Sequence, residues 1–151
     1  MPSGAASISG AVPFQIGKAN RLREGKDVTI IACGLMVAMA LEAAHMLLTQ
    51  ERIEARVLDM HTIKPIDRQA IETAARDTGA LVTAEEHLLE GGLGAAVARV
   101  VTETLPAPVE FVGIQDRYAQ SGAPERLLEE YGLTPSAIAS AARRAIQRKR
   151  K

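Results

Sequence analysis

The chain has 151 residues, and its 18 basic and 18 acidic side chains give a formal net charge of zero. Hydrophobic residues make up 47% of it and charged residues 24%, a balance that fits a globular domain with its own core and argues against intrinsic disorder. Aromatic residues amount to only 3%, so the core must be aliphatic, and stacking platforms for single-stranded nucleic acid are almost absent.

The two ends of the chain differ in composition from its middle. Residues 1–12 lack the basic start and apolar centre of a secretory signal, and we expect them to form a flexible leader before a domain over residues 13–147. Residues 148–151 are expected to form a basic tail. A helix dipole favours basic side chains at its C-terminus, so this end predicts no nucleic-acid partner. Its basic residues are Arg143, Arg144, Arg148, Lys149, Arg150 and Lys151.

A single cysteine, Cys33, excludes an intrachain disulfide and a cysteine zinc cluster. It precedes Gly34 at a turn and has no basic neighbour, so we predict a small buried thiol. One thiol fits a reducing compartment, and we expect the protein in the cytoplasm. No apolar run reaches the roughly 18 residues of a membrane span, so no membrane partner is predicted.

Strand and helix patterns alternate along the chain. The short polar segment 19–23 predicts an antiparallel edge strand, since charge at an edge discourages unwanted pairing. The segment 27–33 is β-branched and apolar on both faces, which predicts a buried parallel strand. Further strands are predicted at residues 55–60, 80–84 and 109–113.

Helix formers and capping residues predict the helices between these strands. Residues 35–50 form the first helix. Asp67 is the predicted N-cap of a helix over residues 68–77 that stops at Gly79. The alternation of elements predicts one α/β/α sandwich. Further helices are predicted from Leu93 onward, from Pro124 to Gly132, and after Thr134-Pro135, where an N-cap precedes a proline at the first helical position.

The stretch from Thr83 to Gly94 is the most informative part of the chain. An apolar run stops at two carboxylates and an imidazole, a glycine cluster follows, and a helical pattern then begins. In an open α/β sheet, ligands or neighbouring domains dock beyond the carboxyl ends of the strands, where a helix N-terminus offers free N–H groups to an anion or a carboxylate. We therefore predict an interface or an anion site at Glu85, Glu86, His87, Leu88, Leu89, Gly91, Gly92 and Gly94. Asp116 and Arg117, after the last strand, are candidates for an internal ion pair or an interdomain contact.

The glycines of this stretch have a structural alternative. They do not match a dinucleotide fingerprint, because six residues separate them from the strand and Val97 occupies the third glycine position. They do not match a phosphate loop, because no Gly-Lys-Ser/Thr follows. Glycines at a helix start also permit a tight turn and close packing, which needs no ligand.

Acid–base or metal chemistry would need more than Glu85, Glu86 and His87. Consecutive residues of a strand point to opposite faces, so the two carboxylates are not expected to share a proton. His61 follows the second parallel strand and would border the same crevice as His87 if the first two parallel strands are neighbours, which leaves a general-base role open. His45 is expected to be a core or partly buried histidine. No complete catalytic, cofactor or metal-ligand set is predicted.

Four stretches, through their order and spacing, resemble the C-terminal domain of transketolase. The resemblance spans about residues 13 to 146. Related domains end the β-subunit of 2-oxo acid dehydrogenase E1 and deoxyxylulose-phosphate synthase, but the Glu-Glu-His and Asp-Arg-Tyr stretches are closer to transketolase, particularly the split kind encoded as two subunits. The four stretches are residues 13–19 with 22–25, residues 57–67, Glu85-Glu86-His87 with residues 91–94, and residues 112–118 running to Ser121-Gly122.

This resemblance implies a five-stranded mixed sheet in the order 1-3-2-4-5, with the first strand antiparallel. It also implies that two other domains of the complete enzyme bind thiamine diphosphate and Mg²⁺, through a Gly-Asp-Gly motif and an activating glutamate that this chain lacks. We expect the isolated chain to be inactive and to bind no cofactor. Within a whole enzyme it would support two-carbon ketol transfer between sugar phosphates, as in the pentose phosphate pathway.

The expected topology also locates the crevice and a contact surface. Right-handed crossovers place the switch point of the sheet between Gly34-Leu35 and Glu85-Glu86-His87. Leu88-Leu89 has no evident core role, so we expect a two-fold homodimer through about residues 85 to 95, besides contacts with the missing N-terminal transketolase domains or subunit. The alternative is a free-standing interaction or regulatory module that binds a protein or a small anion at this crevice without catalysis.

Overall fold

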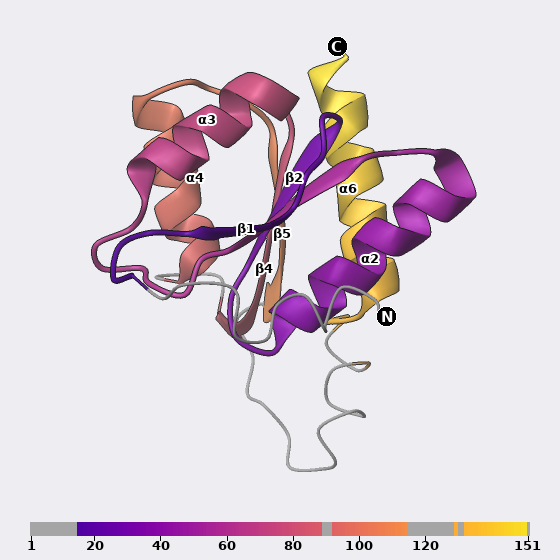
Figure 1. Cartoon of the computed structure of the whole chain (residues 1–151), viewed down its shortest axis with the longest axis horizontal. Coiled ribbons are helices and arrows are strands. Elements are labelled where there is room, and N and C mark those ends of the chain that lie inside the picture. Colours follow the sequence, from indigo (N-terminus) through magenta and orange to yellow (C-terminus); the bar gives the residue numbers. More distant parts are fainter. Residues whose placement is uncertain (1–14, 89–91, 115–128, 130–131, 151) are drawn as a thin grey trace.

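The computed structural model describes residues 15–88, 92–114, 129 and 132–150 (Figure 1). These residues form one five-stranded sheet covered by helices on both faces. The strands are β1 (Asn20–Arg23), β2 (Val28–Ala32), β3 (Ala55–Asp59), β4 (Leu81–Leu88) and β5 (Val109–Ile114). The helices are α2 (Met36–Glu51), α3 (Arg68–Thr78), α4 (Leu93–Glu103) and α6 (Pro135–Lys149).

The strand order is β1-β3-β2-β4-β5. The edge strand β1 is antiparallel to β3, and all other neighbouring pairs are parallel. Helices α2 and α6 cover one face of the sheet and α3 and α4 cover the other (Figure 1). The predicted three-layer sandwich, its strand order and its antiparallel edge strand are therefore confirmed.

Two aliphatic cores lie on the two faces of the sheet. Ile30 packs with the side chains of α2 and α6, whereas its neighbour Ile31 packs with those of α3 and α4. Both isoleucines are fully buried, because β2 is the central strand and successive residues of a strand point to opposite faces. This explains why the segment is apolar on both faces. Among the described residues, no helix is long and apolar enough to cross a membrane.

Both predicted helix N-caps are confirmed. The Asp67 carboxylate accepts a hydrogen bond from the Ala70 amide at 3.0 Å, and its second oxygen accepts one from the Ala19 amide at 2.9 Å. This second bond ties the segment before β1 to the start of α3. The Thr134 hydroxyl oxygen accepts from the Ala137 amide at 3.1 Å. The helix predicted from Pro124 to Gly132 lies almost wholly outside the described residues.

Helix α6 runs through the first two residues of the expected basic tail. The ammonium of Lys149 donates to the carbonyls of Asp27 at 2.6 Å and Thr78 at 2.7 Å. Arg148 donates to the Glu110 carboxylate at 2.7 Å. The expected boundary after residue 147 therefore lies inside a helix whose last turn is fixed to the sheet.

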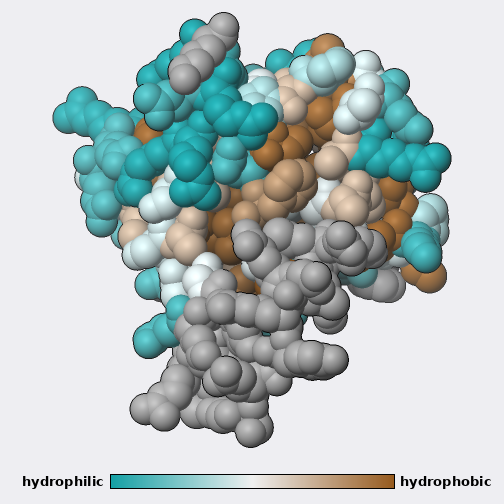
Figure 2. Space-filling view, turned by 180° about the vertical axis from the view of Figure 1, so that it is seen from behind, coloured by the Kyte–Doolittle hydropathy of each residue, from teal (hydrophilic) through white to brown (hydrophobic). Residues whose placement is uncertain are grey.

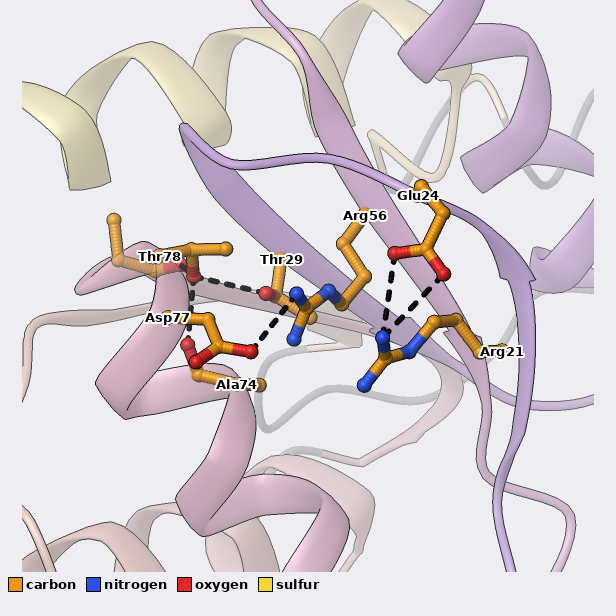
Figure 3. Close-up of polar contacts among 8 residues, drawn as sticks. Arg21, Glu24, Thr29, Arg56, Ala74, Asp77 and Thr78 are labelled. Carbon is orange, nitrogen blue, oxygen red and sulfur yellow. Dashed lines mark hydrogen bonds and ion pairs between the residues drawn. The ribbon is translucent and has the colours of Figure 1, made fainter.

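Buried polar groups gather at the amino ends of the strands, the end of the sheet opposite the predicted site (Figure 3). The hydroxyls of Thr29 and Thr78 lie 2.9 Å apart, and Thr78 also donates to the Ala74 carbonyl. Arg56 is only 6% exposed, and its Nη2 lies 3.0 Å from the Asp77 carboxylate. Its Nε and Nη1 have no hydrogen-bond partner within the described part of the chain.

Candidate functional site

The neighbouring strands β2 and β4 bring the two halves of the predicted switch point together. Ala32 pairs with Ala84, and the Cys33 amide donates to the Ala84 carbonyl at 3.4 Å. After β2 the chain turns at Gly34, which has a φ of 62°. The Leu35 amide then lies 3.3 Å from Oε1 of Glu86. The two segments therefore lie side by side at the switch point of the sheet, as the expected topology requires.

The fully buried carboxylate of Glu85 closes the N-terminus of α4. Its two oxygens accept hydrogen bonds from the amides of Leu93 and Gly94, both at 2.7 Å. The N-cap residue of α4 is Gly92, which has no side chain to perform this role. A carboxylate at this position also interacts favourably with the helix dipole. These two N–H groups are consequently not free for an external anion.

Glu86 caps the N-terminus of α2, the helix on the other face of the sheet. Its carboxylate accepts from the Leu35 amide at the start of α2, a helix that has no side-chain cap from its own N-cap residue. Glu85 and Glu86 therefore point to opposite faces, as predicted, and bind different helices. Glu86 is only half-buried, so the α2 bond is more exposed to water than the α4 bonds.

Gly94 allows α4 to approach the sheet closely. A Cβ atom at this position would lie 2.7 Å from Cδ1 of Phe111, 2.9 Å from Oγ1 of Thr83 and 3.2 Å from Oε2 of Glu85. A distance below 3.0 Å forces a neighbour to move, so the position favours glycine for steric reasons. This is the structural role that the sequence left open for the glycine cluster.

Several predicted site residues are described only in part or not at all. His87 and Leu88 belong to β4, which is longer than the predicted strand because its pairing with β5 resumes at Leu88 after a register shift. The predictions for Leu89, Gly91, Asp116 and Arg117 lie outside the described residues.

Acidic groups surround the thiol of Cys33 at the carboxyl end of β2. Burial raises the pKa of Cys33 to about 11, and the negative charges of Glu85, Glu86 and Asp59 act in the same direction. Burial also raises the pKa of the Asp59 carboxyl, an effect that the nearby His61 opposes. The thiol is thus protonated at neutral pH and is a poor nucleophile.

The possible pairing of His61 with His87 stays a prediction, because the side chain of His87 lies outside the described part of the chain. The amide of Met60 donates to the Ala32 carbonyl at 2.8 Å, so the chain entering His61 still runs beside β2. The Nδ1 atom of His61 lies 3.0 Å from the Thr62 hydroxyl. The prediction that His45 is a core or partly buried residue is wrong, because His45 is exposed on α2. The described residues hold no cluster of three or more acidic, histidine or cysteine side chains suited to a metal.

Two apolar side chains at the same edge are exposed, and their exposure was not predicted from the sequence. Leu35 is 47% exposed and Ile16 is 73% exposed. Residue Asn20 pairs with Asp59, so the segment before β1 lies at the carboxyl end of the parallel strands. The sequence could have indicated that Leu35 is exposed, since Leu35 follows a glycine turn at the switch point and precedes the helix. A signal for the Glu85 cap existed as well, since α4 starts after a glycine and needs an acceptor from elsewhere.

The sequence and the fold both match known proteins. The family model described as "Transketolase, C-terminal domain" matches residues 17–138. The chain is 47% identical to the 6-deoxy-6-sulfo-D-fructose transketolase subunit SqwH of Clostridium sp. (strain MSTE9), over 90% of the chain and 42% of that protein. It is 44% identical to an apulose-4-phosphate transketolase subunit of Phocaeicola vulgatus, over 85% of the chain and 41% of that protein.

A solved structure titled "Split gene transketolase, inactive beta4 tetramer" superimposes on the chain with a TM-score of 0.89 and 50% identity. The match covers 93% of this chain and 46% of that chain. The chain thus spans less than half the length of the relatives that it matches. The family-model match extends over most of the described residues, and the chain belongs to the transketolase C-terminal domain family.

Proposed function

We propose that this chain is the C-terminal domain of a transketolase subunit of the split kind, and that its carboxyl edge docks against the rest of the enzyme. One observation carries the docking role: Glu85 and Glu86 occupy helix amides at this edge, while the apolar Leu35 stays exposed beside them. The helix amides at this edge already have hydrogen-bond partners, and an apolar side chain is exposed beside them. Such an edge is better suited to contact another protein surface than to bind a small anion. The proposal covers residues 85–95 together with Leu35.

The proposed reaction of the complete enzyme is two-carbon ketol transfer between sugar phosphates, within the pentose phosphate pathway of the cytoplasm. The family assignment and the names of the relatives support this class of reaction. Those names refer to different sugars, so the proposal stops at the substrate class. A homodimer through residues 85–95, in addition to a partner subunit, is part of the same proposal.

The carboxyl edge does not fit the diphosphate of thiamine diphosphate. The amides of Leu93 and Gly94 are bonded to Glu85, and the charges of Glu85, Glu86 and Asp59 lie near Cys33 at this edge. A diphosphate would meet repulsion at this edge. We therefore propose that other domains of the enzyme hold the cofactor and its Mg²⁺, and that this domain supplies contacts rather than chemistry.

A chimera tests the docking role. This chain would replace the homologous segment of the apulose-4-phosphate transketolase subunit of Phocaeicola vulgatus, and the hybrid would be assayed with the remaining part of that enzyme. We expect the hybrid to assemble and to retain measurable ketol transfer. A folded hybrid that neither assembles nor turns over would contradict the proposal.

A matched pair of substitutions makes this test specific. Leu35→Asp places a charge at the proposed interface, and Leu48→Asp places the same charge near the opposite end of α2, on a leucine that is 39% exposed. We expect Leu35→Asp to weaken assembly about tenfold or more, and Leu48→Asp to change it little. Equal effects of the two changes would remove Leu35 from the interface.

Calorimetry on the chain alone separates this proposal from a free-standing anion-binding module. Titration with thiamine diphosphate and Mg²⁺, and separately with inorganic phosphate, should give no saturable heat. Saturable binding of phosphate that Glu86→Gln alters would favour the regulatory module. Micromolar binding of thiamine diphosphate would contradict the proposed division of labour between domains.

A further inference from the structure

The two edges of the sheet are built differently. At one edge, β1 has only four residues, carries two arginines and has a register shift between Arg21 and Arg23. These features discourage pairing with another strand. At the other edge, β5 has six residues, and Phe111 on it is 41% exposed. Figure 2 shows apolar atoms gathered in a band on this side of the molecule, between two hydrophilic flanks.

The hydrogen-bonding groups of Phe111 face the open edge. The Leu81 amide of β4 donates to the Pro108 carbonyl at 3.0 Å, and successive peptide groups of a strand alternate in direction. The peptide groups of Val109, Phe111 and Gly113 therefore point away from β4. Arg148 already donates to the Val109 carbonyl at 3.1 Å. Within the described part of the chain, the outward N–H and C=O groups of Phe111 have no hydrogen-bond partner.

Side chains on the two faces of β5 give this edge a defined chemistry. On the α6 face, Arg144 and Arg148 lie 3.0 and 2.7 Å from the Glu110 carboxylate. The two arginine side chains are more than half exposed, whereas Glu110 is 18% exposed, so this rim has a net positive charge. On the α4 face, the Phe111 ring lies over Gly94, which has no side chain to cover it.

We propose that the β5 edge binds an extended segment of a partner protein as an added strand. Apolar side chains of that segment lie beside Phe111 on the α4 face, and acidic side chains alternate with them beside Arg144 and Arg148. Main-chain bonds to Phe111 supply affinity, and the alternating side chains supply specificity. Arg148 already donates a hydrogen bond to the Val109 carbonyl, so this carbonyl is not available to an added strand. The added strand therefore pairs with β5 from Phe111 toward the carboxyl end.

Charge favours this partner over a second copy of the chain. Two β5 strands that pair antiparallel about a two-fold axis would place both α6 helices on the same face of the joined sheet. The exposed Arg144 and Arg148 of the two copies would then lie on one face, where only the two Glu110 carboxylates would balance the four guanidinium groups. A partner segment with acidic residues satisfies these guanidinium groups instead.

Three synthetic peptides test the chemistry of the edge. The first alternates Glu and Val over seven residues with blocked ends, the second replaces each Glu by Lys, and the third replaces the central Val of the first by Pro. We expect saturable binding of the first peptide, with amide chemical-shift changes centred on Phe111 and Gly113 in a nitrogen-labelled sample. The Lys and Pro peptides should bind about tenfold more weakly or worse.

Two substitutions at one position test the main-chain contribution. Phe111→Ala removes the ring and keeps the outward N–H, whereas Phe111→Pro removes both without breaking a bond to β4, since proline is tolerated where an edge N–H faces solvent. We expect the Ala variant to bind the first peptide more weakly than the wild type, and the Pro variant to bind it more weakly still. Arg144→Gln, an exposed change, supplies the same test through charge if the Pro variant does not fold.

The outcomes decide the proposal. Equal affinity for the Glu and Lys peptides, shift changes away from β5, or equal binding by the Ala and Pro variants would overturn it. Wild-type self-association in sedimentation that Phe111→Pro abolishes would assign the edge to a second copy instead. Binding of the Glu peptide through β5, by a wild-type protein whose oligomeric state Phe111→Pro leaves unchanged, supports the proposal.

Discussion

Glu85 and Glu86 are neighbours in β4, yet each closes the N-terminus of a different helix on a different face of the sheet. The alternation of side chains along a strand makes this arrangement available to any two consecutive residues. Here it fixes the starts of α2 and α4 to the same strand at the switch point. The pair explains why two acidic residues end an otherwise apolar run.

The two carboxylates should differ in their contribution to stability. Glu85→Gln leaves one acceptor for two buried amides and turns an NH₂ group toward the second amide, which should cost about 2–3 kcal/mol of unfolding free energy. Glu86→Gln weakens one half-exposed bond of 3.3 Å and should cost about 0.5 kcal/mol. Urea unfolding of both variants measures the difference. Equal losses would show that the Glu85 bonds to α4 contribute no more to stability than the Glu86 bond to α2.

Gly94→Ala should destabilise the domain although alanine favours helix. The new methyl group gains about 1 kcal/mol in helix propensity but collides with Phe111 and Thr83, at an expected cost of about 1–3 kcal/mol. Phe111 is partly exposed and its side chain can move, whereas Thr83 is buried.

A double-mutant cycle with Phe111→Ala checks the assigned collision. Gly94→Ala should cost less in the Phe111→Ala background, because the ring that meets the new methyl group is gone. The free energies of unfolding of all four proteins measure this coupling. Additive effects would mean that the strain lies elsewhere.

The fold could be predicted from the sequence because its signals are local. The double-faced apolar pattern of residues 27–33 indicated the central strand, and Asp67 and Thr134 indicated two helix starts. Hydrogen bonds between a side chain and an amide three residues away need no tertiary knowledge. The strand order came from the family resemblance, since local patterns alone do not specify which strands pair.

The candidate site was harder to predict because its contacts are nonlocal. Glu85 bonds to Leu93 and Gly94 only once β4 and α4 pack together. Lys149 likewise contacts Asp27 and Thr78, which are distant in the sequence, so its anchoring could not be read from the basic end of the chain. His45 was misjudged because its apolar neighbours on α2 face the core while it does not.

Cys33 should react slowly with alkylating reagents. With a pKa of about 11, only about one thiol in a thousand is ionised at pH 8, and the thiolate is the reactive form. The rate of iodoacetamide labelling should rise through pH 9 to 11 in the folded protein and at lower pH in urea. Glu86→Gln, which removes one nearby negative charge, should speed labelling of the folded protein. Fast labelling of the folded wild type at pH 8 would contradict the acidic surroundings inferred for the thiol.

Asp59 and Glu110 should affect the pH dependence of stability in opposite directions. Burial raises the pKa of Asp59, so its favourable contribution is present below its ordinary pKa and is lost as pH rises through the raised value. Burial acts in the same direction on Glu110, but hydrogen bonds from Arg148 and Arg144 outweigh it and lower the pKa of Glu110. The contribution of Glu110 is therefore present above its ordinary pKa and is lost as pH falls through the lowered value.

The amide variants isolate these two contributions. At pH 7, Asp59→Asn should raise the free energy of unfolding, whereas Glu110→Gln should lower it by about 0.5–1 kcal/mol, since the Glu110 ion pairs are partly exposed and screened. Near pH 3 both differences should shrink, because the wild-type carboxyls are then increasingly protonated. Urea unfolding from pH 3 to pH 7, repeated at high salt, measures both effects. A Glu110→Gln loss that is independent of pH would assign the effect to packing, and a loss on Asp59→Asn at pH 7 would show that the charged form of Asp59 stabilises the edge.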